Sequence, residues 1–212
     1  MSGHVEHEVK LDAEPDLVLP DLSGVAPGIR AWARPTLVLD ATYFDAADRR
    51  LLAAGVTVRR RSGEGTRWTV KLPAVRPGTG EERSVAVTRR ELDVFDEGVD
   101  VPAEVQELLA DWLAGAELVP VARLISHRRR VALALDPVGA HPLAEVDDDL
   151  VSVEVAQRPV GRFREIEVEE TDVADASRPV LEAAVARLRA AGCRPAPTTS
   201  KLARALALVA EA

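Results

Sequence analysis

The sequence has few of the residues that hold small secreted proteins together. It contains one cysteine, Cys193, which excludes an internal disulfide framework and a zinc site built from several cysteines. No apolar run approaches the roughly 18–20 residues of a membrane-spanning helix. The N-terminus opens with charged residues, unlike a secretory signal peptide. These absences predict a cytoplasmic protein that does not bind membranes.

Positive charge is also in deficit. The 212 residues include 27 Lys and Arg against 35 Asp and Glu, which gives a formal net charge of −8. Nucleic acids are bound through a broad basic face, so a general nucleic-acid-binding function is excluded. Aromatic residues make up 3% of the chain and hydrophobic residues 47%, which predicts a core of Val, Leu and Ala. The length suits a single domain, residues 1–212.

Several segments alternate charged and apolar residues with a period of two, which is typical of a β-strand with two different faces. In residues 5–11, for example, Glu6, Glu8 and Lys10 share one face and the valines and leucine lie on the other. The alternation recurs at residues 57–61, 67–72, 128–135, 144–155 and 165–169. Gly-rich and Pro-rich turn signals separate these short strands, which predicts an antiparallel meander or barrel.

Four segments have helical patterns instead. Asp45 is a candidate cap for a helix that runs through Leu52 and ends at Gly55. The other three predicted helices cover residues 103–113, 177–191 and 199–209. Together the two kinds of element predict an α+β fold.

Charges of opposite sign concentrate on different strands, whereas an ordinary surface intersperses them. Carboxylates gather on the first and later strands, and Arg and Lys gather on the middle ones. One interpretation is that every charged face is solvated. The other is that the apolar faces pack outward against helices, so that the charged faces line a lumen with a cationic and an anionic wall. Such a lumen would bind a run of phosphates together with Mg²⁺ or Mn²⁺.

The N-terminal motif Glu6-x-Glu8-x-Lys10 resembles the ExExK signature of the CYTH domain, a group also called triphosphate tunnel metalloenzymes. Alone the motif is weak, but several further segments resemble the family in the same order, and together they are specific. These segments are Tyr43-Phe44-Asp45, Arg59-x-Arg61, Trp68 to Pro73, Arg89-x-Glu91, the strand with Arg128, Glu165-x-Glu167 and Ser200-Lys201. The resemblance covers nearly the whole chain.

The resemblance implies an eight-stranded antiparallel β-barrel that forms a tunnel, with helices packed outside. It also implies that Glu6, Glu8 and Lys10 take part in catalysis. Basic residues at the matching positions would bind phosphate, namely Lys10, Arg59, Arg61, Lys71, Arg89, Arg128, Arg130 and Lys201. Acidic residues would hold Mg²⁺ or Mn²⁺, namely Glu6, Glu8, Asp147, Glu165 and Glu167.

Two strands leave the inward-facing residue open. In the stretch His127-Arg128-Arg129-Arg130, the sequence allows the inward position to shift by one residue. Around Arg89, the apolar parity of Val85 and Val87 conflicts with the family spacing, and Arg83 is an alternative tunnel residue.

The function predicted from these features is divalent-metal-dependent hydrolysis of inorganic triphosphate or short polyphosphate. The alternatives are a non-catalytic polyphosphate-binding module, a thiamine triphosphatase and a class IV adenylyl cyclase. Many bacterial proteins of this type join the domain to a helical CHAD domain, so the resemblance also implies a CHAD-type partner in a longer protein.

Overall fold

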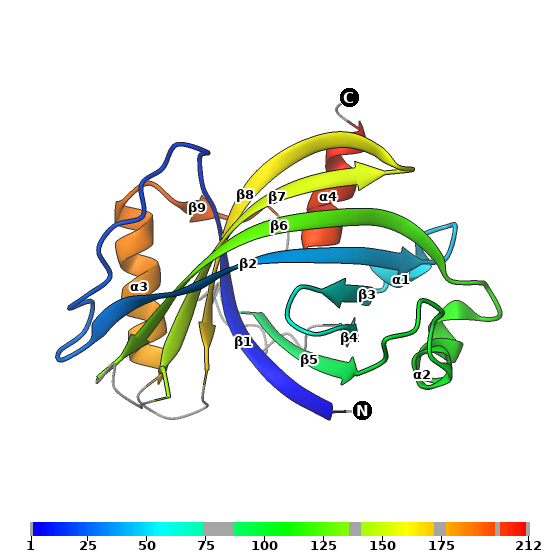
Figure 1. Ribbon diagram of the computed structural model, residues 1–212, viewed down its shortest axis with the longest axis horizontal. Coiled ribbons are helices and arrows are strands. Elements are labelled where there is room, and N and C mark those ends of the chain that lie inside the picture. The colour runs from blue at the N-terminus through cyan, green and yellow to red at the C-terminus, as the bar shows by residue number, and fades with distance from the viewer. Residues whose placement is uncertain (1, 74–86, 136–140, 172–176, 198–199, 211–212) are drawn as a thin grey trace, which may run out of the picture.

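The computed structural model describes residues 2–73, 87–135, 141–171, 177–197 and 200–210, apart from the side chains of residues 2–6 and 87–89. Nine strands form one sheet in the order β5-β4-β3-β2-β6-β7-β8-β1-β9, and every pairing is antiparallel. Figure 1 shows the long strands curving around a common interior. The strands are β1 Ser2–Asp12, β2 Arg30–Asp45, β3 Thr57–Ser62, β4 Arg67–Lys71, β5 Val87–Val94, β6 Val119–Ala134, β7 Ala144–Val155, β8 Arg158–Glu170 and β9 Arg194–Pro195.

The two ends of the sheet meet at β1, which changes partner along its length. Its residues Ser2–Glu8 pair with β5, while Glu8–Asp12 pair with β8. Among the described residues, Glu8 is the one residue of β1 that pairs with both β5 and β8, so the wall is incomplete beside the first half of β1. The expected closed barrel of eight strands is therefore corrected to an open tunnel of nine strands, in which the two-residue β9 pairs with the end of β1.

The predicted strand parity holds on the convex face, where the apolar side chains meet helices. Val58, Trp68 and Val70 are buried on this face and form one apolar cluster with residues of α2. Val9 and Leu11 of β1 are buried in a second cluster with α3. Because alternate residues point to opposite faces, the charged residues between them face the interior.

Four helices are described: α1 Arg50–Ala53, α2 Ala103–Leu113, α3 Ser177–Ala190 and α4 Lys201–Ala210. The predictions for α2, α3 and α4 agree with these bounds to within two residues. None of the helices in the described part of the chain combines the length and the apolar character that crossing a bilayer requires.

The predicted cap position is corrected, because α1 begins at Arg50 and its N-cap residue is Arg49. The side chain of Asp45 nevertheless contacts the start of the helix. Its buried carboxylate accepts hydrogen bonds from the backbone N–H groups of Ala46, Leu51 and Leu52, at 2.7, 3.0 and 3.0 Å. The bonds from Leu51 and Leu52 satisfy N–H groups that a helix start leaves without intrahelical partners. Gly55 follows the helix with φ of +78°, a conformation that favours glycine.

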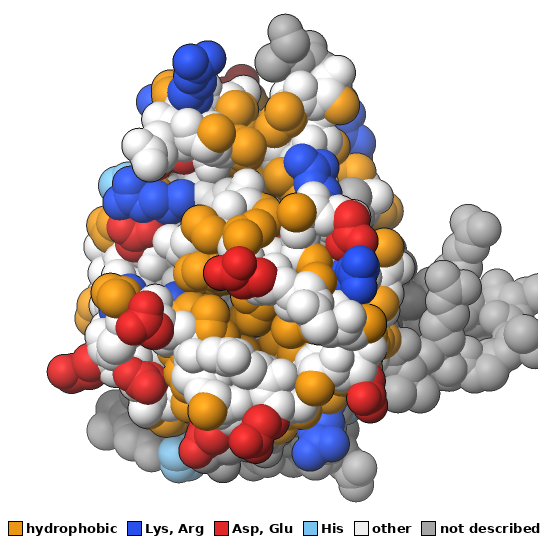
Figure 2. All heavy atoms as spheres, turned by 90° about the vertical axis from the view of Figure 1, so that its right-hand side faces the viewer, with side chains coloured by type: hydrophobic (Ala, Val, Ile, Leu, Met, Phe, Trp, Pro, Cys, Tyr) orange, Lys and Arg blue, Asp and Glu red, His pale blue; other side chains and the backbone are white. Residues whose placement is uncertain are grey.

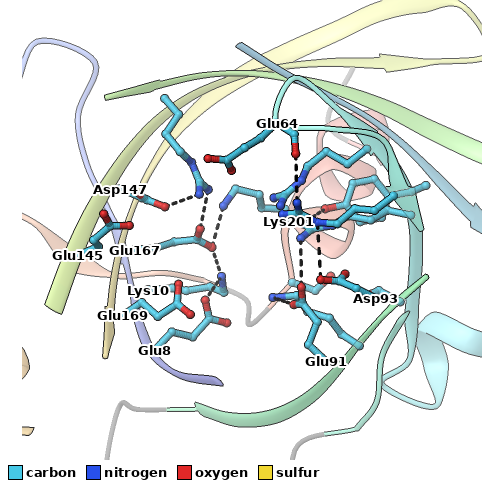
Figure 3. Close-up of a pocket in the computed structure, with 18 of the residues that line it drawn as sticks. Glu8, Lys10, Glu64, Glu91, Asp93, Glu145, Asp147, Glu167, Glu169 and Lys201 are labelled. Carbon is cyan, nitrogen blue, oxygen red and sulfur yellow. Dashed lines mark hydrogen bonds and ion pairs between the residues drawn. The ribbon is translucent and has the colours of Figure 1, made fainter. Parts of the chain in front are cut away.

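The last helix, α4, corrects the expectation that all helices pack outside. Its buried Leu202, Ala205 and Leu206 form a cluster with Leu124 and Val151. Leu124 has the same parity on β6 as Arg128, and Val151 has the same parity on β7 as Asp147, so α4 packs against the interior face. Figure 3 shows its ribbon behind Lys201, within the curve of the strands. The interior is therefore apolar where α4 fills it and charged beyond its N-terminus.

Candidate functional site

One cavity of about 220 Å³ collects the charged side chains that β1–β8 turn toward the interior. Figure 3 shows these side chains converging from opposite walls. Nineteen described residues line the cavity: Glu8, Lys10, Tyr43, Thr57, Arg59, Arg61, Glu64, Arg67, Lys71, Glu91, Asp93, Arg128, Arg130, Glu145, Asp147, Glu167, Glu169, Ser200 and Lys201. Eight of them are basic, eight are acidic and three are uncharged. The interpretation that the charged faces are solvated on the outside is therefore wrong.

The charges are separated across the cavity, much as the sequence predicts. Glu8, Glu145, Asp147, Glu167 and Glu169 lie together on one side, on β1, β7 and β8. The opposite side carries the basic residues of β3 and β4. The separation is incomplete, because β5 places acidic side chains beside these basic ones. On the outer face seen in Figure 2, by contrast, charges of both signs are interspersed among apolar side chains.

Strands β3 and β4 supply the cationic wall through strict alternation. Arg59 and Arg61 line the cavity, while Arg60 between them donates hydrogen bonds outside it to the carbonyl oxygens of Gly98 and Glu97. Lys71 also lines the cavity, and its ammonium nitrogen lies 2.7 Å from a carboxylate oxygen of Glu91. All three predicted basic residues of these strands therefore face the cavity.

Strand β6 resolves the position that the sequence left open. Arg128 and Arg130 line the cavity, and Arg129 points to the opposite face, where it pairs with Asp148. The guanidinium of Arg128 contacts both carboxylate oxygens of Asp149, at 2.8 and 2.7 Å, and also contacts Asp147. Burial disfavours the charged form of Arg128, but these carboxylates outweigh it and raise its pKa well above the ordinary value.

Lys10 connects β1 to the acidic wall. Its ammonium lies 2.8 Å from Glu8 and forms a short ion pair with Glu167. Burial opposes charge on Lys10, yet Glu167 and Glu8 raise its pKa well above the ordinary value. Burial likewise opposes ionisation of Glu8, and Lys10 with Lys71 lowers the pKa of Glu8 despite it. Both groups are therefore ionised at neutral pH.

Asp147 is the exception on this wall. Burial is the largest cause of a pKa raised to about 7, and the charges of Glu167, Asp149 and Glu145 add to it against the opposing effect of Arg128. At Asp147, the positive charge of Arg128 therefore does not compensate for burial and for the negative charges of the neighbouring carboxylates.

Asp149 and Glu165 are not among the residues that line the cavity. Both are completely buried, and both contact the ammonium of Lys201, at 3.1 and 3.0 Å. Lys201 is placed there by Ser200, whose hydroxyl accepts a hydrogen bond from the N–H of Ala203 and caps α4. A lysine is unfavourable at a helix N-terminus, and the carboxylates offset that cost. Glu165, a predicted metal ligand, thus pairs with Lys201 and does not line the cavity.

Three residues of the predicted site or its alternatives cannot be placed in the cavity. The side chains of Glu6 and Arg89 lie outside the described residues, although their backbones pair with each other between β1 and β5. Arg83 also lies outside the described residues.

Several cavity residues were absent from the predicted site. Arg67 has the parity of Lys71 on β4, and Glu145 has the parity of Asp147 on β7, so alternation alone could have identified both. Glu91 follows Arg89 by two residues, so it has the same parity on β5 and could have been identified in the same way. Glu64 lies in a turn that no periodic pattern covers, and only the folded structure brings it to Arg130, at 3.2 Å. The other cavity residues absent from the prediction are Tyr43, Thr57, Asp93, Glu169 and Ser200.

The acidic wall fits a hard divalent cation in its chemistry. Glu8 Oε1 and Asp147 Oδ1 are buried carboxylate oxygens with no hydrogen-bond partner among the described residues. Carboxylate oxygens are the ligands that Mg²⁺ and Mn²⁺ prefer. The described His, Cys, Asp and Glu side chains do not form a group of three already arranged around a metal position. The neighbouring cations hold the carboxylates in other contacts instead.

Solved structures with little sequence identity share this fold. The bh2851 protein of Bacillus halodurans, a candidate adenylate cyclase, aligns with a TM-score of 0.63 at 17% identity, covering 96% of this chain and 98% of its own. HpAC1 from Hippeastrum, a candidate adenylyl cyclase reported to have a dominant triphosphatase activity, aligns with a TM-score of 0.52 at 16% identity, covering 95% of each chain. At these identities the similarity shows the fold alone.

Sequence comparison gives the family. The Mycobacterium tuberculosis proteins MT2285, from strain CDC 1551 / Oshkosh, and Rv2226, from strain ATCC 25618 / H37Rv, are each 31% identical over 221 residues. The match covers 96% of this chain but only 40% of each of these longer relatives. The model of the CYTH domain matches residues 5–189, which include most of β1, all of β2 to β8 and most of α3. The chain therefore belongs to the CYTH domain family.

Proposed function

We propose that this protein hydrolyses inorganic triphosphate or a short polyphosphate in a reaction that requires Mg²⁺ or Mn²⁺. The observation that carries the proposal is the composition of the cavity, in which sixteen of the nineteen described lining residues are charged and both signs are present. A chain of phosphates with bound divalent cations has the same two signs of charge. The triphosphatase activity reported for HpAC1 gives the proposal further support from a protein with this fold.

The basic residues would bind the phosphates. Arg59, Arg61 and Arg130 enter the cavity from two strands, and each guanidinium offers a planar set of donors that matches phosphate oxygens. Lys10 remains protonated because its pKa lies well above the ordinary value, so it stabilises negative charge and does not act as a general base. Rate enhancement would come mainly from positioning and charge stabilisation.

Glu8, Asp147 and Glu167 would hold the divalent cation. All three line the cavity, and two of them present the carboxylate oxygens that lack hydrogen-bond partners among the described residues. A bound cation would supply neutralisation of phosphate charge and activation of water. Without it these carboxylates would repel the substrate.

The lining is less suited to an organic group. Tyr43 provides the single aromatic ring among the described lining residues, and its hydroxyl lies 3.4 Å from the guanidinium of Arg59. Adenine and thiamine rings are usually held by apolar and aromatic surface, so the cyclase and thiamine triphosphatase alternatives have less support. Binding of polyphosphate without turnover stays an alternative function. A CHAD-type partner domain also stays a proposal, and it is compatible with the greater length of the M. tuberculosis relatives.

The test is phosphate release from inorganic triphosphate, longer polyphosphate, thiamine triphosphate and ATP, with Mg²⁺, Mn²⁺ or EDTA. We expect triphosphate or short polyphosphate to be the best substrate and EDTA to abolish release. Binding of polyphosphate without release under any condition would replace the proposal with the binding module.

Two neighbouring arginines on β3 provide a matched pair of variants. Arg61→Ala removes a guanidinium from the cavity, and we expect kcat/KM to fall about tenfold to a hundredfold, in line with the loss of a charged hydrogen bond. Arg60→Ala removes the same group from the opposite face, where it contacts backbone carbonyls, and should leave kcat/KM unchanged. Equal losses in both variants would contradict the placement of the substrate in this cavity.

A further inference from the structure

The cavity is neutralised by its own side chains. Lys71 pairs with Glu91 at 2.7 Å, and Arg130 pairs with Glu64 at 3.2 Å. Groups that would bind phosphate are thus held by carboxylates of the same cavity. An incoming anion must compete with these carboxylates before it can use the cations.

Among these carboxylates, Glu167 contacts three of the basic side chains. Its carboxylate contacts Lys201 at 2.7 Å, Arg128 at 3.0 Å and Lys10 through a short ion pair. Burial opposes ionisation of Glu167, and these three cations nevertheless keep its pKa well below the usual range. Figure 3 shows Glu167 between Lys10 and the other basic groups. Three cations from β1, β6 and α4 therefore share one carboxylate.

We propose that Glu167 is an exchange residue that makes anion binding and divalent-cation binding depend on each other, an inference that rests on the proposed function. In the structure described here, Glu167 pairs with cations that phosphate requires. When phosphate binds those cations, Glu167 becomes a buried carboxylate with too few partners, which is unfavourable. A divalent cation at Glu167 removes that cost and releases the three basic side chains to the phosphate.

The consequence is positive coupling between the two ligands. The anion should bind more tightly in the presence of the divalent cation, and by linkage the cation should bind more tightly in the presence of the anion by the same factor. Coupling between sites commonly amounts to about 5–150-fold in affinity, and we expect the effect of Glu167 to lie in this range.

Other acidic residues of the cavity do not occupy this position. Glu8 contacts one of the cations, Lys10, at 2.8 Å. Asp149 contacts Arg128 and Lys201 but is completely buried and does not line the cavity, whereas Glu167 lines it and is accessible to an arriving cation. Glu145 lines the same wall and forms an ion pair at 2.9 Å with Arg34, which does not line the cavity. Glu145→Gln is therefore a matched control for Glu167→Gln.

The experiment is calorimetric titration with bismethylene triphosphate, whose P–C–P links resist hydrolysis, in EDTA and in saturating Mn²⁺. We expect Mn²⁺ to tighten binding to the wild-type protein and to Glu145→Gln by the same factor. In Glu167→Gln, we expect tighter binding than wild type in EDTA and a gain from Mn²⁺ that is at least fivefold smaller. Direct association of Mn²⁺ with the analogue is common to all three proteins, so it cancels from the comparison.

An equal gain from Mn²⁺ in Glu167→Gln and wild type would overturn the inference, as would weaker binding of the variant in EDTA. The reciprocal titration, Mn²⁺ into wild type with and without the analogue, needs no variant and must show the same positive coupling.

The results also distinguish failure of the exchange role of Glu167 from failure of the proposed function. Metal-dependent phosphate release from triphosphate by a wild-type protein that lacks the coupling would remove the exchange role and leave the activity standing. Absence of analogue binding under every condition would remove both.

Discussion

Asp147→Asn should stabilise the metal-free protein at neutral and alkaline pH. Asp147 has an ordinary pKa of 3.8 and a pKa of about 7 in the folded protein. Below pH 3.8 the group is protonated in both the folded and the unfolded state. Between the two values the unfolded state ionises first, so rising pH favours unfolding, and the full cost is present above pH 7.

The magnitude follows from the two pKa values. Their difference corresponds to about 4 kcal/mol of unfolding free energy above pH 7. The pKa of about 7 already includes the attraction of Arg128, so this difference is net of that contact. The Asn oxygen can still accept a hydrogen bond from Arg128, which also keeps both contacts to Asp149, so we expect a gain of about 2–4 kcal/mol. For a chain of this length the melting temperature would rise by about 4–16 °C.

The assay is thermal unfolding in EDTA at pH 8 and at pH 5. The gain should be present at pH 8 and should shrink at pH 5, because most of the Asp147 carboxyl groups are then protonated in the folded wild type. Saturating Mn²⁺ should raise the melting temperature of the wild type more than that of the variant, since the ion would use this carboxylate. A variant that melts below wild type at pH 8 in EDTA would refute the reasoning.

Two further substitutions test how the fold positions the cavity. Asp45→Ala removes the acceptor of three backbone N–H groups and should lower the unfolding free energy by about 2–4 kcal/mol in urea titrations. A loss below about 0.5 kcal/mol, on the order of an ordinary surface substitution, would show that water replaces the carboxylate. Leu202→Ala leaves a gap between α4 and the interior face of the sheet and should cost about 2–4 kcal/mol by the same method. An unchanged unfolding midpoint for Leu202→Ala would contradict the placement of α4 inside the tunnel.

Much of the cavity wall could be predicted from alternation along the strands. The parity of Arg59 and Arg61 against Val58, and of Lys71 against Trp68 and Val70, correctly groups the side chains that share a face, because alternate residues of a strand point to opposite faces. Alternation alone allows the charged face to point to solvent or to the interior. The concentration of opposite charges on different strands and the family resemblance favoured the interior. The family resemblance adds the position of Lys201, which no period reveals.

Other features could not be predicted, because they depend on contacts between distant segments. Parity places Glu165 and Glu167 on the same face of β8 but does not say that α4 covers one and leaves the other in the cavity. The apolar stripe of α4 is compatible with either face of the sheet. At Glu8, β1 changes its partner from β5 to β8, and this change depends on how the two ends of the curved sheet come together, which no local sequence pattern encodes.

The most direct test of the account is the rate of phosphate release from inorganic triphosphate as a function of Mn²⁺ concentration, for wild type and Glu8→Gln. Glu8 lines the cavity, contacts Lys10 at 2.8 Å and has a carboxylate oxygen without a hydrogen-bond partner among the described residues. The account predicts release by wild type that requires Mn²⁺, and loss of that release in a Glu8→Gln variant that still folds. Equal release by the two proteins, or no release by wild type with any divalent cation, would contradict it.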